Sequence, residues 1–459
     1  METQYQSALD YLYRFVDYSL TRQDRLAAAK FDLQRMVDLM DLLGNPQSNY
    51  PIVHIAGTKG KGSTAAMIAS VMQNAGYRVG LYSSPHLQDY CERIQINHLN
   101  ITHANLVRMV DYVKPFVEKV DGLTTFEITT ALGFLAFADA KVEIAVVEVG
   151  LGGRLDATNV VNPLVSVITS LSYDHMNVLG NTISQIATEK AGIIKPNRPI
   201  ILAPQEETPF HVIEQIAAER SAPLTRIGMD YLYSPKSHSL DGQKLILWKK
   251  EDQTCMNDYL DSDGRTKWQP IQINIPLLGF HQIQNAVTAY AVVEEVRKNG
   301  FIVRDQAILD GFANVKWPGR FELLCKAPLL VVDSAHNSDS ALKLRLAMDD
   351  YLGEKPVILI FGVSEDKDIS GMFMQLMPRV KKVIATQSTH PRAFPANKLV
   401  ELAHQFGRPA IGTSDIVSAL EIAIKEAGQD AAIVVAGSIF VAAAVREEWP
   451  KLEQRFIEN

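Results

Sequence analysis

Short and nearly continuous apolar runs alternate with longer helical patterns through the first half of the chain. A strand that keeps one face in water alternates apolar and polar residues, so continuous runs predict strands covered on both faces. These predicted strands are 51–57, 77–84, 143–150, 164–172 and 199–204. Helices are predicted over 63–76 and from Thr182, where Gln185 follows three residues later in a capping-box pattern. This alternation predicts a parallel sheet flanked by helices.

The pattern changes at about residue 224. Two apolar runs, 244–252 and 268–278, are separated by a polar stretch with glycine and aspartate, which predicts a small antiparallel insertion over about 224–278. A long helix is predicted to follow, and a new set of strands begins after Pro318 and Gly319. We therefore predict a larger domain over 1–316 and a smaller doubly wound α/β domain over 317–459.

Composition narrows the class of protein. The chain has 459 residues, 47% of them apolar and 21% charged, which is typical of a soluble globular protein of two or three structural units. Its net charge of -7 gives no general attraction to nucleic acid or to an anionic membrane. Three distant cysteines fit a reducing compartment, and no segment resembles a secretion signal or a membrane span. We expect a cytoplasmic protein without nucleic-acid or membrane partners.

A glycine-rich turn, GTKGKGS at 57–63, lies between a predicted strand and a predicted helix. Glycines let backbone N–H groups turn toward phosphate oxygens, and the helix N-terminus adds partial positive charge. Lys61 is placed to reach the β- and γ-phosphates, with a hydroxyl of Ser63 or Thr64 close to a metal. The spacing departs from the strict phosphate-loop pattern, so a merely flexible turn is the alternative. The flanking strand and helix favour a nucleotide site.

Ionisable residues follow two neighbouring predicted strands. Glu148 ends one strand, and Asp174 and His175 follow the next. In open α/β sheets ligands bind just beyond such strand ends, so Glu148 is placed to hold a cation beside the phosphates. Mg²⁺ prefers oxygen ligands, which makes a histidine ligand unusual, and His175 could instead be an ordinary loop residue.

Lys190 lies in a predicted helix among small and apolar neighbours. A lone helical lysine is usually solvated, but a partly desolvated one has a lowered pKa and can be neutral. Neutral amines react with CO₂ to give carbamates, and a carbamate is an anion able to bind a second metal ion.

Nine segments resemble, in content and order, those of bacterial folylpolyglutamate synthases and dihydrofolate synthases, which are Mur ligases. They cover nearly the whole chain: GTKGKGS, SSPHLQDYCERI, LTTFEITT, EVGLGGRLDATN, SYDHMNVLG, EKAGIIK, HQIQNA, PGRFE and DSAHN. The resemblance implies an α/β fold with a phosphate-loop ATPase domain, a smaller Rossmann-like glutamate-ligase domain and an active site between them. It also implies a monomer that uses ATP and Mg²⁺ to join L-glutamate to a folate carboxylate through an acyl phosphate.

The resemblance assigns roles residue by residue. It implies catalytic roles for Lys61, His175 and Lys190. The implied nucleotide contacts are Thr58, Lys59, Gly60, Lys61, Gly62, Ser63, Asn285, Arg320, Asp333 and His336. The implied ligands of two Mg²⁺ ions are Ser84, Glu148, His175 and Lys190 as a carbamate. The implied substrate contacts on the pterin side are Lys30, Phe31, Asp32, Thr124, Thr125, Phe126, Glu127, Leu155, Asp156 and Ala157.

Several of these residues have purely structural alternatives. Phe126 could belong to the core and Arg320 could pair with Glu322, while polar residues could pair within or cap helices, namely Asn285, Asp333 and Asn337. The chain also departs from the family pattern. Lys59 stands where asparagine is common, Asp32 where glycine is, and Gln34 where glutamate is. The last two positions leave open whether dihydropteroate is a substrate.

Three other functions are alternatives to folate ligation. A Mur-type ligase could act on another acceptor such as a cell-wall precursor, although the LTTFEITT segment argues against it. A nucleotide-dependent switch would need the glycine-rich turn but not Glu148, His175 and Lys190 together. A structural protein with a degenerate site would need none of these groups.

Overall fold

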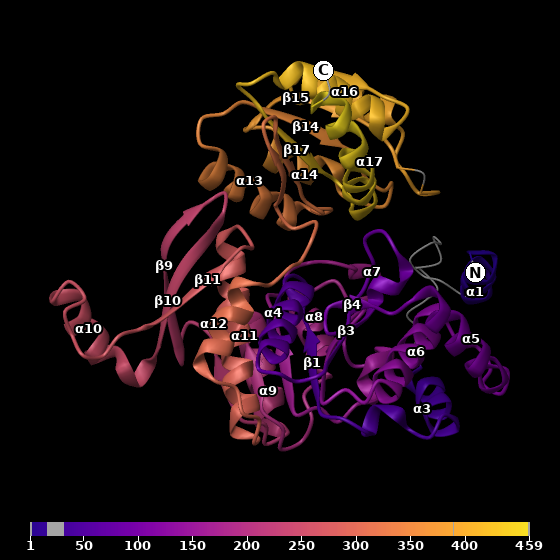
Figure 1. Ribbon diagram of the computed structural model, residues 1–459, viewed down its shortest axis with the longest axis vertical. Coiled ribbons are helices and arrows are strands. Elements are labelled where there is room, and N and C mark those ends of the chain that lie inside the picture. The colour runs from indigo at the N-terminus through magenta and orange to yellow at the C-terminus, as the bar shows by residue number, and fades with distance from the viewer. Residues whose placement is uncertain (1, 16–31, 389, 458–459) are drawn as a thin grey trace. The chain divides into compact units, whose positions relative to one another are not determined.

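The computed structural model describes residues 2–15, 32–388 and 390–457 (Figure 1). Its described residues form two compact units. The first falls within Met1–Lys236, Lys244–Ile275 and Gln282–Val315, and the second within Ser237–Gln243, Pro276–His281 and Lys316–Asn459. Among the described residues, no helix is long and apolar enough to cross a membrane.

The first unit is built on an eight-stranded sheet of order β4-β3-β2-β5-β1-β6-β7-β8. Its strands are β1 (Ile52–Ala56), β2 (Val79–Tyr82), β3 (Ile94–Ile96), β4 (Leu99–Asn100), β5 (Ile144–Glu148), β6 (Val165–Ile168), β7 (Ile200–Leu202) and β8 (Leu224–Arg226). The six strands from β2 to β8 are parallel, and β3 and β4 add an antiparallel edge. The continuous apolar runs are buried, as a sheet covered on both faces requires.

Helices cover this sheet. They are α1 (Glu2–Tyr13), α3 (Leu33–Leu42), α4 (Lys61–Asn74), α5 (His103–Val117), α6 (Thr125–Asp139), α7 (Met176–Leu179), α8 (Ile183–Ala191), α9 (Glu207–Glu219), α11 (Phe280–Lys298) and α12 (Asp305–Ala313). Short 3₁₀ turns are η2 (Pro46–Ser48), η3 (Tyr90–Arg93) and η4 (Ala157–Val160). The predicted capping box at the start of α8 is confirmed, because Thr182 and Gln185 exchange both hydrogen bonds.

Two glycines bring α6 close to β2. A Cβ at Gly80 would lie 2.7 Å from the Phe137 ring, and one at Gly133 would lie 2.8 Å from Tyr82. Both aromatic side chains are fully buried. This close packing fixes α6 against the strand, and with it the segment at the N-terminus of α6.

The predicted insertion is partly wrong at its start. Residues from 224 form β8, which pairs in parallel with β7 and is the last strand of the main sheet. The insertion is a three-stranded sheet of order β11-β10-β9, with β9 (Tyr231–Ser239), β10 (Gly242–Lys249) and β11 (Ile271–Ile275). A two-residue turn joins β9 to β10, which is possible only for antiparallel neighbours. The polar stretch between β10 and β11 contains η5 (Lys250–Asp252) and helix α10 (Gln253–Asp261).

The second unit has a six-stranded sheet of order β12-β13-β17-β14-β15-β16. The strands are β12 (Glu322–Lys326), β13 (Leu329–Val332), β14 (Val357–Phe361), β15 (Val380–Ala385), β16 (Ala410–Gly412) and β17 (Ala432–Ala436), and the helices are α13 (Ser338–Leu352), α14 (Ile369–Leu376), α15 (Ala396–Gln405), α16 (Ile416–Ala427) and α17 (Ile439–Ile457). Only β12 is antiparallel to its neighbour. The predicted doubly wound α/β architecture is confirmed, with β16 as a short strand that was not predicted.

Candidate active site

The candidate site lies where four neighbouring parallel strands of the first unit end. In the sheet order, β2, β5, β1 and β6 follow one another. Their carboxyl ends lead to Ser84, to Glu148, to the glycine-rich turn from Gly57, and to the loop with Asp174 and His175. Since parallel strands bring these ends to one sheet edge, the predicted common edge for Glu148, Asp174 and His175 is confirmed, and Ser84 lies at the same edge.

The glycine-rich turn adopts a conformation that only glycine accepts easily. Gly57 has φ 150° and Gly60 has φ 88°. A Cβ at Gly57 would lie 1.8 Å from Thr169 Oγ1, and a Cβ at Gly60 would lie 2.3 Å from Asn285 Oδ1. Both the backbone angle and the close neighbours therefore exclude side chains here. The turn is held in place from β6, because the N–H groups of Thr58 and Lys59 both donate to the Ser170 carbonyl oxygen, at 3.0 and 3.1 Å.

Two lysines converge on one carbonyl group of this turn. Lys190 Nζ donates to the Gly57 oxygen at 2.9 Å, and Lys61 Nζ donates to the same oxygen at 3.3 Å. Lys61 Nζ also lies 3.9 Å from Glu148 Oε1. The structure thus brings together three predicted site residues from α4, α8 and the end of β5.

The desolvation predicted for Lys190 is confirmed. Its side chain is 5% exposed. Burial lowers the pKa of Lys190 to about 7, and the positive charges of Lys61 and Lys59 act in the same direction while Asp174 and Asp156 oppose them. A lysine in this position is largely neutral in mildly alkaline solution, and a neutral amine is a nucleophile.

Lys59 and His175 are positioned by Asp174. Lys59 Nζ donates to Asp174 Oδ2 at 3.1 Å, so the lysine that stands where asparagine is common in the family is paired within the protein. His175 has a left-handed backbone (φ 48°) and precedes α7, and its side chain is half-exposed. Its Nε2 lies 3.8 Å from Asp174 Oδ1. Asp174 was not among the predicted site residues, although its position next to His175 after a predicted strand could have identified it as one.

Two further polar groups complete the phosphate turn. Asn285 on α11 donates to Gln282 Oε1 at 3.0 Å, the pairing within the helix that was the structural alternative, yet its Oδ1 also packs against Gly60. Thr64 in the first turns of α4 is fully buried, and its hydroxyl has no hydrogen-bond partner among the described residues. The sequence had offered Thr64 only as an alternative to Ser63.

In the predicted pterin segment at the start of α6, three polar side chains make hydrogen bonds within the protein. Thr124 and Glu127 exchange both hydrogen bonds of a capping box, and Glu127 accepts from Arg35 Nε at 3.2 Å. Thr125 Oγ1 donates to the Leu12 carbonyl oxygen at 2.9 Å. Phe126 is half-buried rather than fully in the core, with its ring against the Gly150 backbone. Phe126 is therefore the residue of this segment whose side chain keeps exposed surface.

The second predicted pterin segment, 155–157, is fixed by a buried carboxylate. Asp156 Oδ2 accepts from the Leu151 N–H at 2.8 Å, and its Oδ1 accepts from the Thr158 N–H at 3.0 Å. Burial raises the pKa of Asp156 despite these bonds. Thr158 Oγ1 also lies 2.8 Å from His54 Nε2, and burial lowers the pKa of that histidine to about 3. Leu155 is half-buried and Ala157 is buried.

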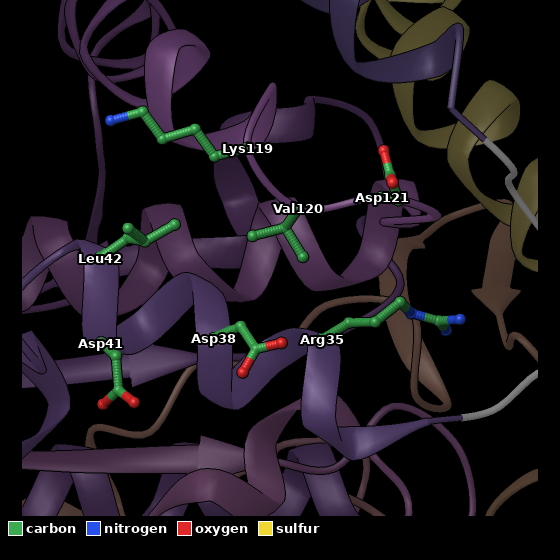
Figure 2. Close-up of a pocket in the computed structure, with 7 residues that line it drawn as sticks. All are labelled: Arg35, Asp38, Asp41, Leu42, Lys119, Val120 and Asp121. Carbon is green, nitrogen blue, oxygen red and sulfur yellow. The ribbon is translucent and has the colours of Figure 1, made fainter.

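The third predicted pterin segment is described only at its end. Lys30 and Phe31 lie outside the described residues, and Asp32 caps α3 by accepting from the Gln34 N–H at 2.9 Å. A surface hollow of about 660 Å³ opens on α3 (Figure 2), and none of its lining residues was predicted as a site residue. Its lining residues are Arg35, Asp38, Asp41, Leu42, Lys119, Val120 and Asp121. Arg35 links this hollow to Glu127.

The remaining predicted nucleotide contacts belong to the second unit. Asp333 follows β13 and accepts from the Phe321 and Ala335 N–H groups, each at 2.7 Å. His336 Nδ1 lies 2.9 Å from the Ser334 carbonyl oxygen. Arg320 donates to the Gly319 oxygen at 3.0 Å. Its alternative partner Glu322 instead pairs with Arg446 at 2.8 Å. Asn337 caps α13, as its structural alternative predicted.

The first unit has the donor set that Mg²⁺ prefers. Glu148 is a buried carboxylate at the end of β5, and its Oε1 lies 3.9 Å from Lys61 Nζ. The unpartnered Thr64 hydroxyl and the half-buried Ser84 add neutral oxygens from the same edge of the sheet. Hard oxygen donors with room for water suit Mg²⁺. These residues fit the ion.

Comparisons with known proteins place these features in a family. The Mur ligase middle domain matches residues 55–293, and the Mur ligase, glutamate ligase domain matches residues 319–439. The dihydrofolate synthase/folylpolyglutamate synthase of Bacillus subtilis is 34% identical over 423 residues, covering 90% of this chain and 94% of that protein.

Solved structures agree with the sequence comparisons. The Mycobacterium tuberculosis folylpolyglutamate synthase complexed with ADP has a TM-score of 0.83 at 32% identity and covers 97% of this chain and 98% of its own. Escherichia coli FolC in complex with DHPP and ADP has a TM-score of 0.82 at 29% identity, with 98% of each chain covered.

Proposed function

Because this chain belongs to the folylpolyglutamate and dihydrofolate synthases of the Mur ligase family, we infer that it is an ATP-dependent ligase that joins L-glutamate to a folate carboxylate. The observation that carries the site assignment is the convergence of Lys61 and Lys190 on the Gly57 oxygen, with Glu148 beside Lys61. A nucleotide-dependent switch has no need of a buried lysine with a lowered pKa at this position.

The phosphate turn is proposed to hold the β- and γ-phosphates of ATP. N–H groups in the first turn of a helix have no acceptor within that helix, so those of Lys61, Gly62 and Ser63 are available to phosphate oxygens. Lys61 already lies at the turn through Gly57 and can exchange that contact for a phosphate oxygen. Asn285, packed on Gly60, fixes the turn from α11.

Mg²⁺ is proposed to bind through Ser84, Glu148, His175 and Lys190, the last as a carbamate. Bound there, the ions would neutralise charge on the phosphoryl group that is transferred. The protein's own part is to hold the groups in place. Glu148 is fixed by its strand, and Lys190 by its hydrogen bond to the Gly57 oxygen. His175 is held beside Asp174.

The proposed reaction proceeds in two steps. An oxygen of the folate carboxylate attacks the γ-phosphorus of ATP, and ADP leaves. The neutral amine of L-glutamate then attacks the acyl carbon of the resulting acyl phosphate. The bond from that carbon to the phosphate oxygen breaks, and inorganic phosphate leaves with the proton that the nitrogen loses as the amide forms. Electrostatic stabilisation of the transferring phosphoryl group supplies most of the rate, with little covalent chemistry left to the protein.

The substrate proposal has two parts. Phe126 and Leu155 are proposed to line the pterin site, since both keep exposed surface while their polar neighbours are engaged in capping and loop bonds. Tetrahydrofolate and its short polyglutamates are the proposed acceptors, with dihydropteroate as a second acceptor. The units within 1–316 and 317–459 are proposed to be the ATPase and glutamate-ligase domains of a cytoplasmic monomer.

ADP release tests this function. The enzyme is assayed with ATP, Mg²⁺ and L-glutamate, and with tetrahydrofolate, dihydropteroate or a cell-wall peptide precursor as acceptor. We expect release that requires glutamate together with tetrahydrofolate, and no response to the cell-wall precursor. Release with dihydropteroate extends the activity to the first glutamate addition. Release that is indifferent to every pterin would overturn the substrate assignment.

A further inference from the structure

A second group of metal-ligating side chains lies outside the candidate active site. Among the described residues, Asp89, Cys91 and His103 form a group of three whose ligand atoms all lie within 4.8 Å of one another. Asp89 and Cys91 come from the start of η3, and His103 begins α5. None of the three is used by the mechanism proposed above. We propose that this group binds Zn²⁺.

The chemistry of the three donors favours zinc over magnesium. A thiolate, an imidazole and a carboxylate are ligands that Zn²⁺ accepts together, whereas Mg²⁺ takes oxygen alone. In tetrahedral zinc sites, with bonds of about 2.0–2.3 Å, two ligand atoms lie about 3.4–3.6 Å apart. The three ligand atoms lie within 4.8 Å of one another, with 2.7 Å between Asp89 Oδ2 and His103 Nε2, so shifts of about 1 Å would bring them to that spacing. Asp89 and His103 are each partly exposed, which gives an ion a way in and leaves a fourth position for water.

The surrounding contacts orient each donor. Asp89 Oδ1 accepts from the Cys91 N–H at 2.7 Å and from the Tyr5 hydroxyl at 3.2 Å, which leaves Oδ2 facing His103 Nε2 at 2.7 Å. The His103 ring stacks on Tyr5 with centroids 3.6 Å apart, and its Nδ1 lies 3.9 Å from Glu2 Oε2. At 3.9 Å Glu2 makes no hydrogen bond to the ring, but a carboxylate is one of the outer partners that a metal-bound histidine takes at its second nitrogen.

Cys91 is a protonated thiol in the absence of metal. Cys91 is 2% exposed. Its burial, together with the negative charge of Asp89, raises the pKa of the thiol to about 12. Zn²⁺ binding would displace this proton, because the thiolate is the ligand. The competing reading is an Asp89–His103 ion pair with a buried cysteine as filler, and it predicts no metal affinity.

A zinc ion here would join η3 to α5, and α1 contacts both ligands Asp89 and His103 through Tyr5. Tyr5 and Glu2 belong to α1, which Figure 1 shows beside α5. The Leu12 carbonyl oxygen near the end of α1 accepts from Thr125 at the start of α6. Zinc bound to η3 and α5 would therefore fix the helix that contacts the proposed pterin segment. We expect Zn²⁺ to raise the Tm of the enzyme.

Cobalt(II) provides the test, because thiolate ligation to Co²⁺ gives an intense near-ultraviolet charge-transfer absorption. The whole enzyme is titrated with Co²⁺ in excess Mg²⁺ and without thiol reductants. We expect one equivalent of thiolate-bound Co²⁺ that added Zn²⁺ displaces. The absorption should vanish in Cys91→Ser and weaken in His103→Asn.

Two control variants separate this site from other ligands. Cys325→Ser removes a half-buried thiol elsewhere in the chain, and Glu148→Gln removes the proposed Mg²⁺ carboxylate, so both should keep the absorption. Absence of the absorption in the wild type, or its survival in Cys91→Ser, would refute the zinc site. If Cys91→Ser does not fold, two other results test the site. Zn²⁺ should displace the Co²⁺ absorption in the wild type, and Asp89→Asn should lose that absorption; failure of either would refute the zinc site. The result is independent of ligase activity.

Discussion

Replacing Lys190 with methionine isolates the group on which the proposed second Mg²⁺ site depends. Methionine is unbranched like lysine and suits a buried site, but it is one atom shorter and lacks the amine that donates to the Gly57 oxygen. We expect ligase turnover to be lost while ATP binding remains, because Lys61, Gly60 and Asn285 still form the phosphate turn.

The magnitude follows from the pKa of about 7 that burial gives Lys190. At pH 8 about nine-tenths of this amine is neutral, against about 0.3% for a lysine with the ordinary pKa of 10.5. The reactive form is enriched about 300-fold. The lowered pKa corresponds to about 5 kcal/mol against the charged form. Carbamate formation, and turnover with it, should rise as the pH increases through about 7.

Carbon-13 bicarbonate supplies the assay. The enzyme is stripped of CO₂, supplied with labelled bicarbonate at pH 8, and followed by NMR for a carbamate carbon and by ADP release for turnover. Both signals should appear in the wild type and be absent in Lys190→Met. A short carboxylic acid should partly restore turnover to Lys190→Ala by supplying the missing anion.

Lys195→Met is the matched control. Burial also lowers the pKa of Lys195, to about 8, and its Nζ donates to the Asn159 carbonyl oxygen at 2.9 Å. Lys195→Met therefore removes a second lysine of lowered pKa and leaves the contacts of the phosphate turn unchanged. An undiminished carbamate signal in Lys190→Met, or normal turnover in that variant, would refute the carbamate.

Three further changes test other parts of the structure. Gly60→Ala places a Cβ 2.3 Å from Asn285 Oδ1 at φ 88°, so nucleotide affinity should fall at least about tenfold; an unchanged Kd by calorimetry would contradict the proposed turn. His54→Gln should flatten the acid side of the stability curve. Between about pH 6.5 and 3 this histidine is protonated in the unfolded chain but not in the folded one. As the pH falls through this range, the free energy of unfolding of the wild type therefore decreases by up to about 1.4 kcal/mol per pH unit. Urea denaturation at several pH values would show this decrease in the wild type and a smaller one in the variant. Phe126→Leu should raise the KM for the folate and leave the KM for ATP unchanged, and steady-state kinetics showing the reverse would remove Phe126 from the pterin site.

Most strand positions were predictable, because strands that are buried on both faces consist of consecutive apolar residues. Once β1, β5 and β6 are placed in a parallel sheet, the common edge for Lys61, Glu148 and His175 follows from topology alone. Short edge strands have no such run. β16 has three residues that are only partly buried or exposed, and β8 likewise lacks a buried run, so one was missed and the other was assigned to the insertion.

The pairing of the site groups was not predictable, because it depends on loop conformation and side-chain rotamers. Nothing in the sequence indicates that Lys61 and Lys190 share the Gly57 oxygen, or that Asp156 accepts from Leu151 across five residues. The local polar bonds are different. Capping boxes at Thr124 and Thr182 are encoded within four residues, and both have the expected sequence pattern.

Lys59 shows how the structure changes the meaning of an unusual residue. In the sequence it stands where asparagine is common in the family, among the implied nucleotide contacts. In the structure its amine donates to Asp174, and its side chain is only 15% exposed. Burial is the main cause of the low pKa of Lys190, but the Asp174 carboxylate works against it and Lys59 works with it. Pairing Lys59 with Asp174 therefore places a positive charge beside the carboxylate that would otherwise favour protonated Lys190. On this argument Lys59 helps to keep Lys190 neutral, and its contact with phosphate is not required to explain its presence.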